Sequence, residues 1–121
     1  MRIKNESLAL SGTDMTTTIT SDPIWLAHIV NFSIQAVFTG TPNGAFTLQG
    51  SNDEGSKSND VTNAVITNWS TVDSSSKAVT SSGSVLYNIE NAGYRWVRLV
   101  WTDTSSGAST ITSCRSNVKG V

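Results

Sequence analysis

Residues 94–103 read Tyr94-Arg95-Trp96-Val97-Arg98-Leu99-Val100-Trp101-Thr102-Asp103. Aromatic and β-branched residues dominate this stretch, and they suit the pleated, half-buried surface of a strand. Successive side chains of a strand point to opposite faces, so Val97 and Leu99 share one face while Trp96 and Arg98 share the other. Both faces are largely apolar. This pattern predicts a central strand that is covered on both sides or that carries an interface on its outer face.

A second pattern lies upstream of this strand. Apolar side chains occupy every second position from Val30 to Phe38, with mostly polar side chains between them, which predicts a strand with one buried face. A helix over residues 24–30 is the alternative for the start of this segment, but its β-branched content favours a strand. Residues 40–44, Gly-Thr-Pro-Asn-Gly, predict a tight turn, because Asn and Gly tolerate positive φ. With residues 45–50 as its partner, the segment 30–50 is predicted to form an antiparallel hairpin.

Shorter runs of the same kind fill the rest of the chain. They cover residues 2–10, 16–20, 62–69, 84–90 and 108–114, with 115–121 as a last strand or an exposed end. Turns rich in Gly, Ser and Asn separate them, while residues 51–60 predict a polar loop and residues 73–83 a Ser-rich flexible one. We therefore expect an all-β fold, an antiparallel β-sandwich of about seven or eight strands. The length of 121 residues suits a single domain over residues 1–121.

Composition excludes several classes of partner. Charged residues make up only 14% of the chain and the net charge is −1, so no basic field exists to hold a phosphate backbone, and nucleic acid is not an expected partner. No segment approaches the ~20 apolar residues of a membrane span. Residues 1–6 are not followed by the apolar run of a secretory signal. The sequence predicts a protein made in the cytoplasm, which could leave the cell in a particle released by lysis.

Two segments resemble a known superfamily. Residues 46–55, Phe-Thr-Leu-Gln-Gly-Ser-Asn-Asp-Glu-Gly, and residues 68–72, Asn-Trp-Ser-Thr-Val, are similar to a strand, turn and tryptophan strand of discoidin-like (galactose-binding-like) domains. Residues 93–100, Gly-Tyr-Arg-Trp-Val-Arg-Leu-Val, are similar to another strand of these domains. The resemblance implies a sandwich of jelly-roll type, in a superfamily of glycan binders, lipid binders and structural modules. This chain is shorter than the usual domain, and its one cysteine allows no internal disulfide.

A second resemblance rests on the length and composition of the sequence. The chain is compact, rich in Ser, Thr and Asn, and low in charge and cysteine. In this it resembles small bacteriophage virion proteins, namely capsid decoration (cement) proteins and tail accessory proteins. The resemblance implies a structural protein located in the virion, which contacts other virion proteins and further copies of itself as a homo-oligomer.

The sequence offers little for catalysis. His28 and Cys114 are the only histidine and cysteine, and a nucleophilic pair needs contact between them and an orienting group. No Gly-x-Ser-x-Gly motif frames a serine, and zinc would need more His or Cys ligands than exist. We expect a buried or interface histidine, a buried thiol and no enzyme.

The acidic residues of the polar loop allow two interpretations. Asp53, Glu54 and Asp60 supply the hard oxygen ligands that Ca²⁺ prefers, and the resemblance implies that a structural calcium could lie near a loop. The spacing of an EF-hand is missing, which favours a solvated acidic loop without metal. No other cofactor is expected.

The aromatic residues supply the candidate binding surface. Trp69 and Trp101 are predicted to lie in the core. Trp96 either packs in the core or is exposed on the outer sheet face, as an interface anchor or a platform for a sugar ring. With Tyr94, Arg98 and Trp25 it forms the candidate site. The first hypothesis is a structural virion protein acting through protein–protein contacts; the alternative is a carbohydrate-binding module with an exposed aromatic platform, helped by Asn52 and Asp53.

Overall fold

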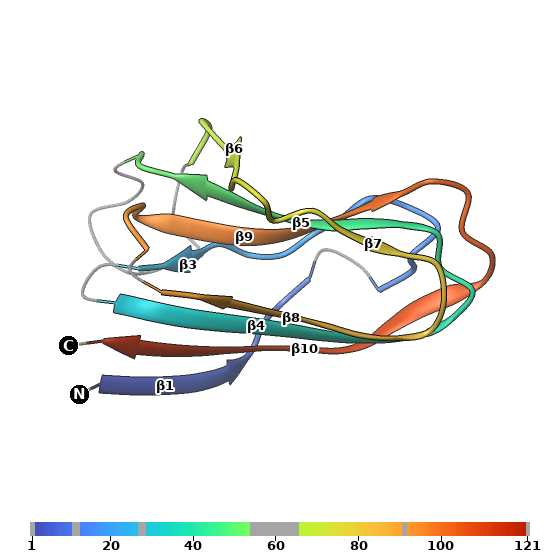
Figure 1. The fold of residues 1–121 in the computed structure, drawn as a ribbon, viewed down its shortest axis with the longest axis horizontal. Helices are drawn as coiled ribbons and strands as arrows, with labels where there is room; N and C mark the ends of the chain where they lie inside the picture. The colour runs from blue at the N-terminus through green and yellow to red at the C-terminus, as the bar shows by residue number, and fades with distance from the viewer. Residues whose placement is uncertain (1, 11–12, 27–28, 54–65, 91, 121) are drawn as a thin grey trace.

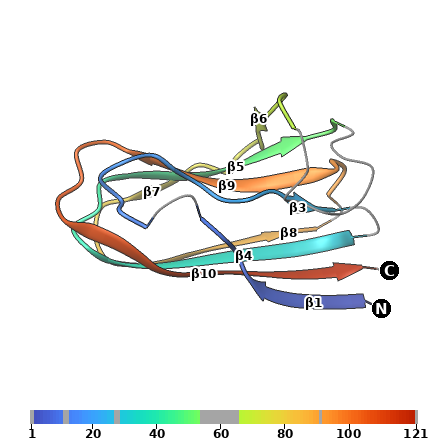
Figure 2. The ribbon, with the colours of Figure 1, turned by 180° about the vertical axis from the view of Figure 1, so that it is seen from behind.

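The computed structural model describes residues 2–10, 13–26, 29–53, 66–90 and 92–120. Ten strands lie in these ranges: β1 (Arg2–Ser7), β2 (Ile19–Thr20), β3 (Ile24–Trp25), β4 (Ile29–Gly40), β5 (Gly44–Ser51), β6 (Ser70–Thr71), β7 (Lys77–Val79), β8 (Gly83–Ile89), β9 (Trp96–Asp103) and β10 (Ser109–Gly120). They form two sheets packed face to face (Figure 1, and from behind in Figure 2). The fold is the expected antiparallel β-sandwich of jelly-roll type. Only six strands have six or more residues, which is why a pattern search expects fewer than ten.

The first sheet has the strand order β1-β10-β4-β8. Its centre is β4, which pairs with β10 on one side and β8 on the other. The predicted alternation is present, because Phe32, Ile34, Ala36 and Phe38 all point inward and are buried. Since β1 pairs with β10, the first and last strands lie side by side at one edge (Figure 1).

Strand β10 unites two predicted pieces, residues 108–114 and the tail. Ile111 and Cys114 are both buried although they lie three residues apart. In a regular strand two residues with this spacing point to opposite faces. The register between β10 and β4 shifts between Ile111 and Ser113, which marks a β-bulge. Because of the bulge, the side chains on both sides of it point into the core. At this bulge the hydroxyl of Thr112 donates to the carbonyl oxygen of Val37 at 3.1 Å.

The second sheet has the order β2-β9-β5-β6, with β3 also on β9 and β7 also on β5. Strand β9 is the predicted central strand, although it begins at Trp96 rather than Tyr94. It pairs with β5 along its whole length and with β2 and β3 on its other side. Its inner residues are buried against the first sheet, and Trp101 Nε1–H donates to the carbonyl oxygen of Met15 at 2.8 Å. Trp101 is therefore a core residue, as predicted.

The predicted hairpin over residues 30–50 is wrong. Strands β4 and β5 follow one another in the chain but lie in different sheets and do not pair. The turn between them crosses the sandwich, so that Phe38 and Phe46 face each other with ring centroids 5.6 Å apart. Gly40, with φ of 95°, starts this crossing, and the N–H of Thr41 donates to the carbonyl oxygen of Ala108. The turn residues hydrogen-bond to a neighbouring loop instead of closing on their own strands.

Two smaller expectations need correction. The predicted strand over residues 62–69 falls mostly outside the described residues, and residues 66–69 are not in a strand; the short β6 follows at Ser70. The expected flexible loop 73–83 contains β7. The helix considered as the alternative for residues 24–30 is absent from the described part of this stretch, which holds β3 and the start of β4. The described residues form no helix long and apolar enough to cross a membrane.

Candidate functional site

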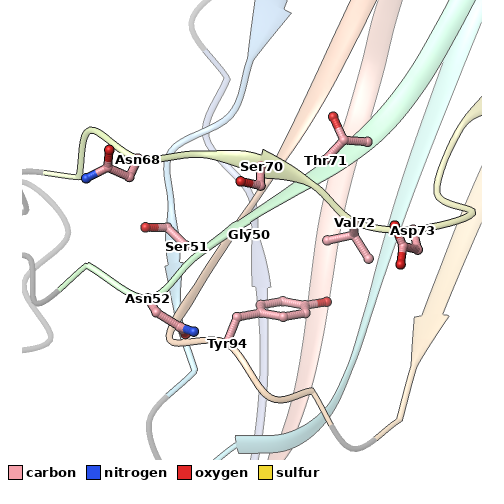
Figure 3. A pocket seen from close by; sticks show the side chains of 9 residues that line it. All are labelled: Gly50, Ser51, Asn52, Asn68, Ser70, Thr71, Val72, Asp73 and Tyr94. Atoms are coloured by element: carbon pink, nitrogen blue, oxygen red, sulfur yellow. The ribbon is translucent and has the colours of Figure 1, made fainter.

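A pocket of about 450 Å³ opens on the side of the sandwich, between the end of β5, the short β6 and the segment that precedes β9 (Figure 3). The ring of Tyr94 forms its floor, and residues 70–73 pass over it (Figure 3). Asn52 lies at one end of the ring, while Val72 and Asp73 lie toward the other. Apart from Tyr94 and Val72, the side chains that line the pocket are polar. The pocket thus combines an aromatic face with amide, hydroxyl and carboxylate groups.

Tyr94 is held between the two sheets. Its ring meets the ring of Phe32 edge-on, with centroids 6.4 Å apart. On the other side it lies against Gly50, where an added Cβ would come within 3.1 Å of the ring. The hydroxyl is buried and has no hydrogen-bond partner among the described residues, and burial raises the pKa of this phenol. Glycine at position 50 is therefore what lets the ring lie flat beneath β5.

Hydrogen bonds fix the polar rim of the pocket. The backbone N–H of Arg95 donates to Oδ1 of Asn52 at 3.0 Å, which sets the orientation of that amide. The Asp53 carboxylate accepts the backbone N–H groups of Thr67 (2.9 Å) and Asn68 (3.0 Å) and the Asn68 side-chain amide. These bonds lower the pKa of Asp53. They tie the segment before β6 to the end of β5, and so position one wall of the pocket.

The outer face of the second sheet carries the other predicted site residues. Trp96 is 0% exposed, so the interpretation of an exposed platform is wrong for this residue. Its ring packs 6.5 Å from that of the half-buried Trp25, and its Nε1–H donates to the carbonyl oxygen of Asp53 at 3.1 Å. Trp69 is not in the core as predicted: it is only half-buried, and the Arg98 guanidinium lies 4.2 Å from its ring centroid.

The four predicted site residues therefore do not form one site. Trp25 and Trp96 are register partners, and with Arg98 they lie on the outer sheet face, whereas Tyr94 lies between the sheets and faces the pocket. Sequence reasoning missed Gln49, which pairs with Arg98 across β5 and β9, and it missed Ser70 at the pocket. Their roles depend on cross-strand register, which carries no local sequence signal.

The remaining candidates contribute no visible catalytic or metal centre. Cys114 is buried, and burial raises the pKa of its thiol to about 11. His28, Glu54 and Asp60 lie outside the described residues, so of the candidate calcium ligands only Asp53 is described. Within the described ranges no three His, Cys, Asp or Glu side chains gather to hold a metal ion.

Comparison with known proteins identifies the fold. No protein-family model matches the chain, and no curated protein matches it in sequence. The SPBc2 prophage-derived protein YomS shares the fold with a TM-score of 0.53 and 10% identity, over 98% of this chain and 95% of that chain. Two further structures are more distant. The Tobacco streak virus coat protein has a TM-score of 0.49 and 10% identity, over 99% of this chain and 87% of that chain. The xylan-binding module CBM86 of Roseburia intestinalis has a TM-score of 0.48 and 6% identity, over 100% of this chain and 97% of that chain. The chain therefore shares its jelly-roll β-sandwich fold with a prophage-derived protein.

Proposed function

We propose that this chain is a structural protein of a bacteriophage virion, a capsid decoration (cement) or tail accessory protein that acts through protein–protein contacts. The observation that carries the proposal is the shared fold with a prophage-derived protein over nearly the whole of both chains. The roles of three of the described carboxylates agree with it. Asp14, Asp53 and Asp103 each accept hydrogen bonds from their own turns or loops, so these carboxylates act structurally.

The surface of the sandwich has room for such contacts. A standard interface takes about 800 Å² from each partner, and the chain exposes 6736 Å², so one sheet face suffices for a neighbour and a second interface still fits. Among the described residues the exposed large hydrophobic side chain is Leu86, on β8 at 56% exposure. The contacts we propose are therefore polar, with aromatic and arginine side chains at their centre, rather than extensions of an apolar core.

The test is the mass of the purified protein in solution. Light scattering across a micromolar to millimolar series, with and without calcium, should show a closed homo-oligomer such as a trimer or hexamer, or the protein should co-sediment with particles of its phage. A strict monomer that also fails to co-sediment contradicts the proposal.

The pocket favours a second candidate function, the binding of a neutral sugar. An aromatic surface with a few fixed polar groups is the usual make-up of a small-molecule site, and the part of the Tyr94 ring that lines the pocket is the surface that a sugar would contact. In this candidate function the sugar contacts Tyr94 rather than Trp96, and the Asn52 side chain hydrogen-bonds to it.

The test is an NMR titration with a panel of neutral mono- and oligosaccharides, which should shift the resonances of Tyr94 and Asn52. An Asn52→Ala variant should lose the binding and stay folded, whereas no shift with any sugar, with or without calcium, contradicts this candidate.

A further inference from the structure

Arg98 is held in one orientation on the outer face of the second sheet. Its Nε–H donates to Oε1 of Gln49, its register partner on β5, at 2.7 Å. Its guanidinium also lies over the ring of Trp69, 4.2 Å from the centroid. The hydrogen bond to Gln49 restricts rotation of the guanidinium group, and the contact with Trp69 holds one face of the group against the indole ring.

The charge of Arg98 has no counter-charge in the part of the chain that the structure describes. Nε uses one of the five N–H donors of a guanidinium, and the terminal nitrogens donate to no described residue. The side chain is half-buried, and this burial lowers its pKa. A cation that is partly removed from water, oriented and unpaired gains more from an incoming anion than a mobile surface arginine does, because less side-chain entropy remains to be lost.

We propose that Arg98 is a docking site for a carboxylate, an Asp or Glu side chain presented by a partner protein. A carboxylate matches the planar fork of the terminal nitrogens and can accept two parallel hydrogen bonds. Arginine and tryptophan are also the residue types that dominate interface energies. The inference rests on the proposed assembly function and names the chemistry of its partner.

The neighbouring rings favour a protein carboxylate over an acidic sugar. A sugar bound here would need an open aromatic face beside the guanidinium. Trp96 is fully buried, and one face of Trp69 is covered by Arg98 itself. The terminal nitrogens of Arg98 donate to no described residue, and a single side-chain carboxylate matches that hydrogen-bonding fork.

The test is a side-chain NMR titration of the full chain with N-acetylglutamate N-methylamide, a probe with one side-chain carboxylate. The Nε resonance of Arg98 and the indole resonance of Trp69 should shift and saturate. They should not shift with the matching glutamine amide, which lacks the charge. Arg98→Lys keeps the charge but loses the fork, so binding should weaken by about tenfold, and Arg98→Gln should abolish it.

Arg95 is the matched control, because it is exposed and lies three residues away in the same segment. Arg95→Gln should leave the titration unchanged. Equal, unsaturable shifts at Arg95 and Arg98 would mean general ionic attraction and overturn the proposal. Glucuronate binding at least tenfold more tightly than the glutamate probe would also overturn it, in favour of an acidic glycan. Light scattering tests the assembly function separately, so a protein that binds the probe but never assembles contradicts the assembly function and not the carboxylate site.

Discussion

The two buried tyrosine hydroxyls differ in one respect, and the difference is testable. Tyr87 OH donates to the carbonyl oxygen of Ser75 at 2.6 Å, whereas Tyr94 OH has no partner in the part of the chain that the structure describes. Replacing Tyr87 by Phe leaves a buried carbonyl without its donor, which should lower the free energy of unfolding by about 1–2 kcal/mol. Tyr94→Phe removes a hydroxyl that makes no bond, so it should cost nothing or stabilise the fold. Urea denaturation of both variants measures the difference; an equal loss in the two would show that Tyr94 OH has a partner in solution.

The Asp53 carboxylate makes stability depend on acid pH. Its hydrogen bonds hold the pKa of Asp53 below the value of the same residue in the unfolded chain, where an aspartate has a pKa of about 4. The stabilisation is therefore present above the unfolded pKa and is lost as the pH falls through the lower folded value. Asp53→Asn should unfold at lower urea than the wild type at pH 7, and the two midpoints should converge in acid. Parallel midpoints over the whole pH range would contradict this account.

Calcium provides a separate test of the same residue. The Asp53 oxygens already accept amide N–H groups of Thr67 and Asn68, and a bound cation would have to compete with those donors. We expect added calcium to leave the thermal midpoint unchanged. A rise that disappears in Asp53→Asn would instead establish the calcium site considered from the sequence.

At the scale of the elements, the packing of β5 on Tyr94 depends on a missing side chain. A Cβ at Gly50 would lie 3.1 Å from the Tyr94 ring, closer than most real contacts, so the ring would have to give by a few tenths of an ångström while held by Phe32 on its other side. Gly50→Ala should destabilise the protein by about 1–3 kcal/mol, as overpacking commonly does, and should alter the pocket. Gly93→Ala is the control, because a Cβ there meets nothing within 4 Å. Denaturation midpoints check the pair, and equal losses would contradict the role of Gly50.

Most of the long strands could be predicted from the sequence, but the short strands β6 and β7 and the pairing partners of the strands could not. Alternation marks the inward face of β4, because burial is repeated there at every second residue, and β9 is recognised by apolar residues on both of its faces. The turn at Pro42 to Gly44 suggests a hairpin by its chemistry, yet it serves equally well to cross between sheets. The bulge in β10 and the pairing of Gln49 with Arg98 arise from tertiary register. The site was predictable only as a set of residue types, since register decides which of them meet.

At the scale of the whole molecule, the single thiol reports on the opening of the sandwich. Cys114 is buried in β10, paired with Ala36 of β4 on one side, and its carbonyl oxygen accepts the N–H of Leu8 just after β1. Burial raises its pKa to about 11, so the native thiol is both inaccessible and protonated near pH 8.

A disulfide reagent should label Cys114 about a thousandfold more slowly in the native protein than in the unfolded chain, because we expect the reaction to require global unfolding. The labelling rate should then rise with urea with the slope of the equilibrium unfolding transition. Rapid labelling that is independent of urea would contradict this, and would show that β1 separates from β10 while the rest of the sandwich stays folded, which would expose the edge of β10 for pairing with another chain.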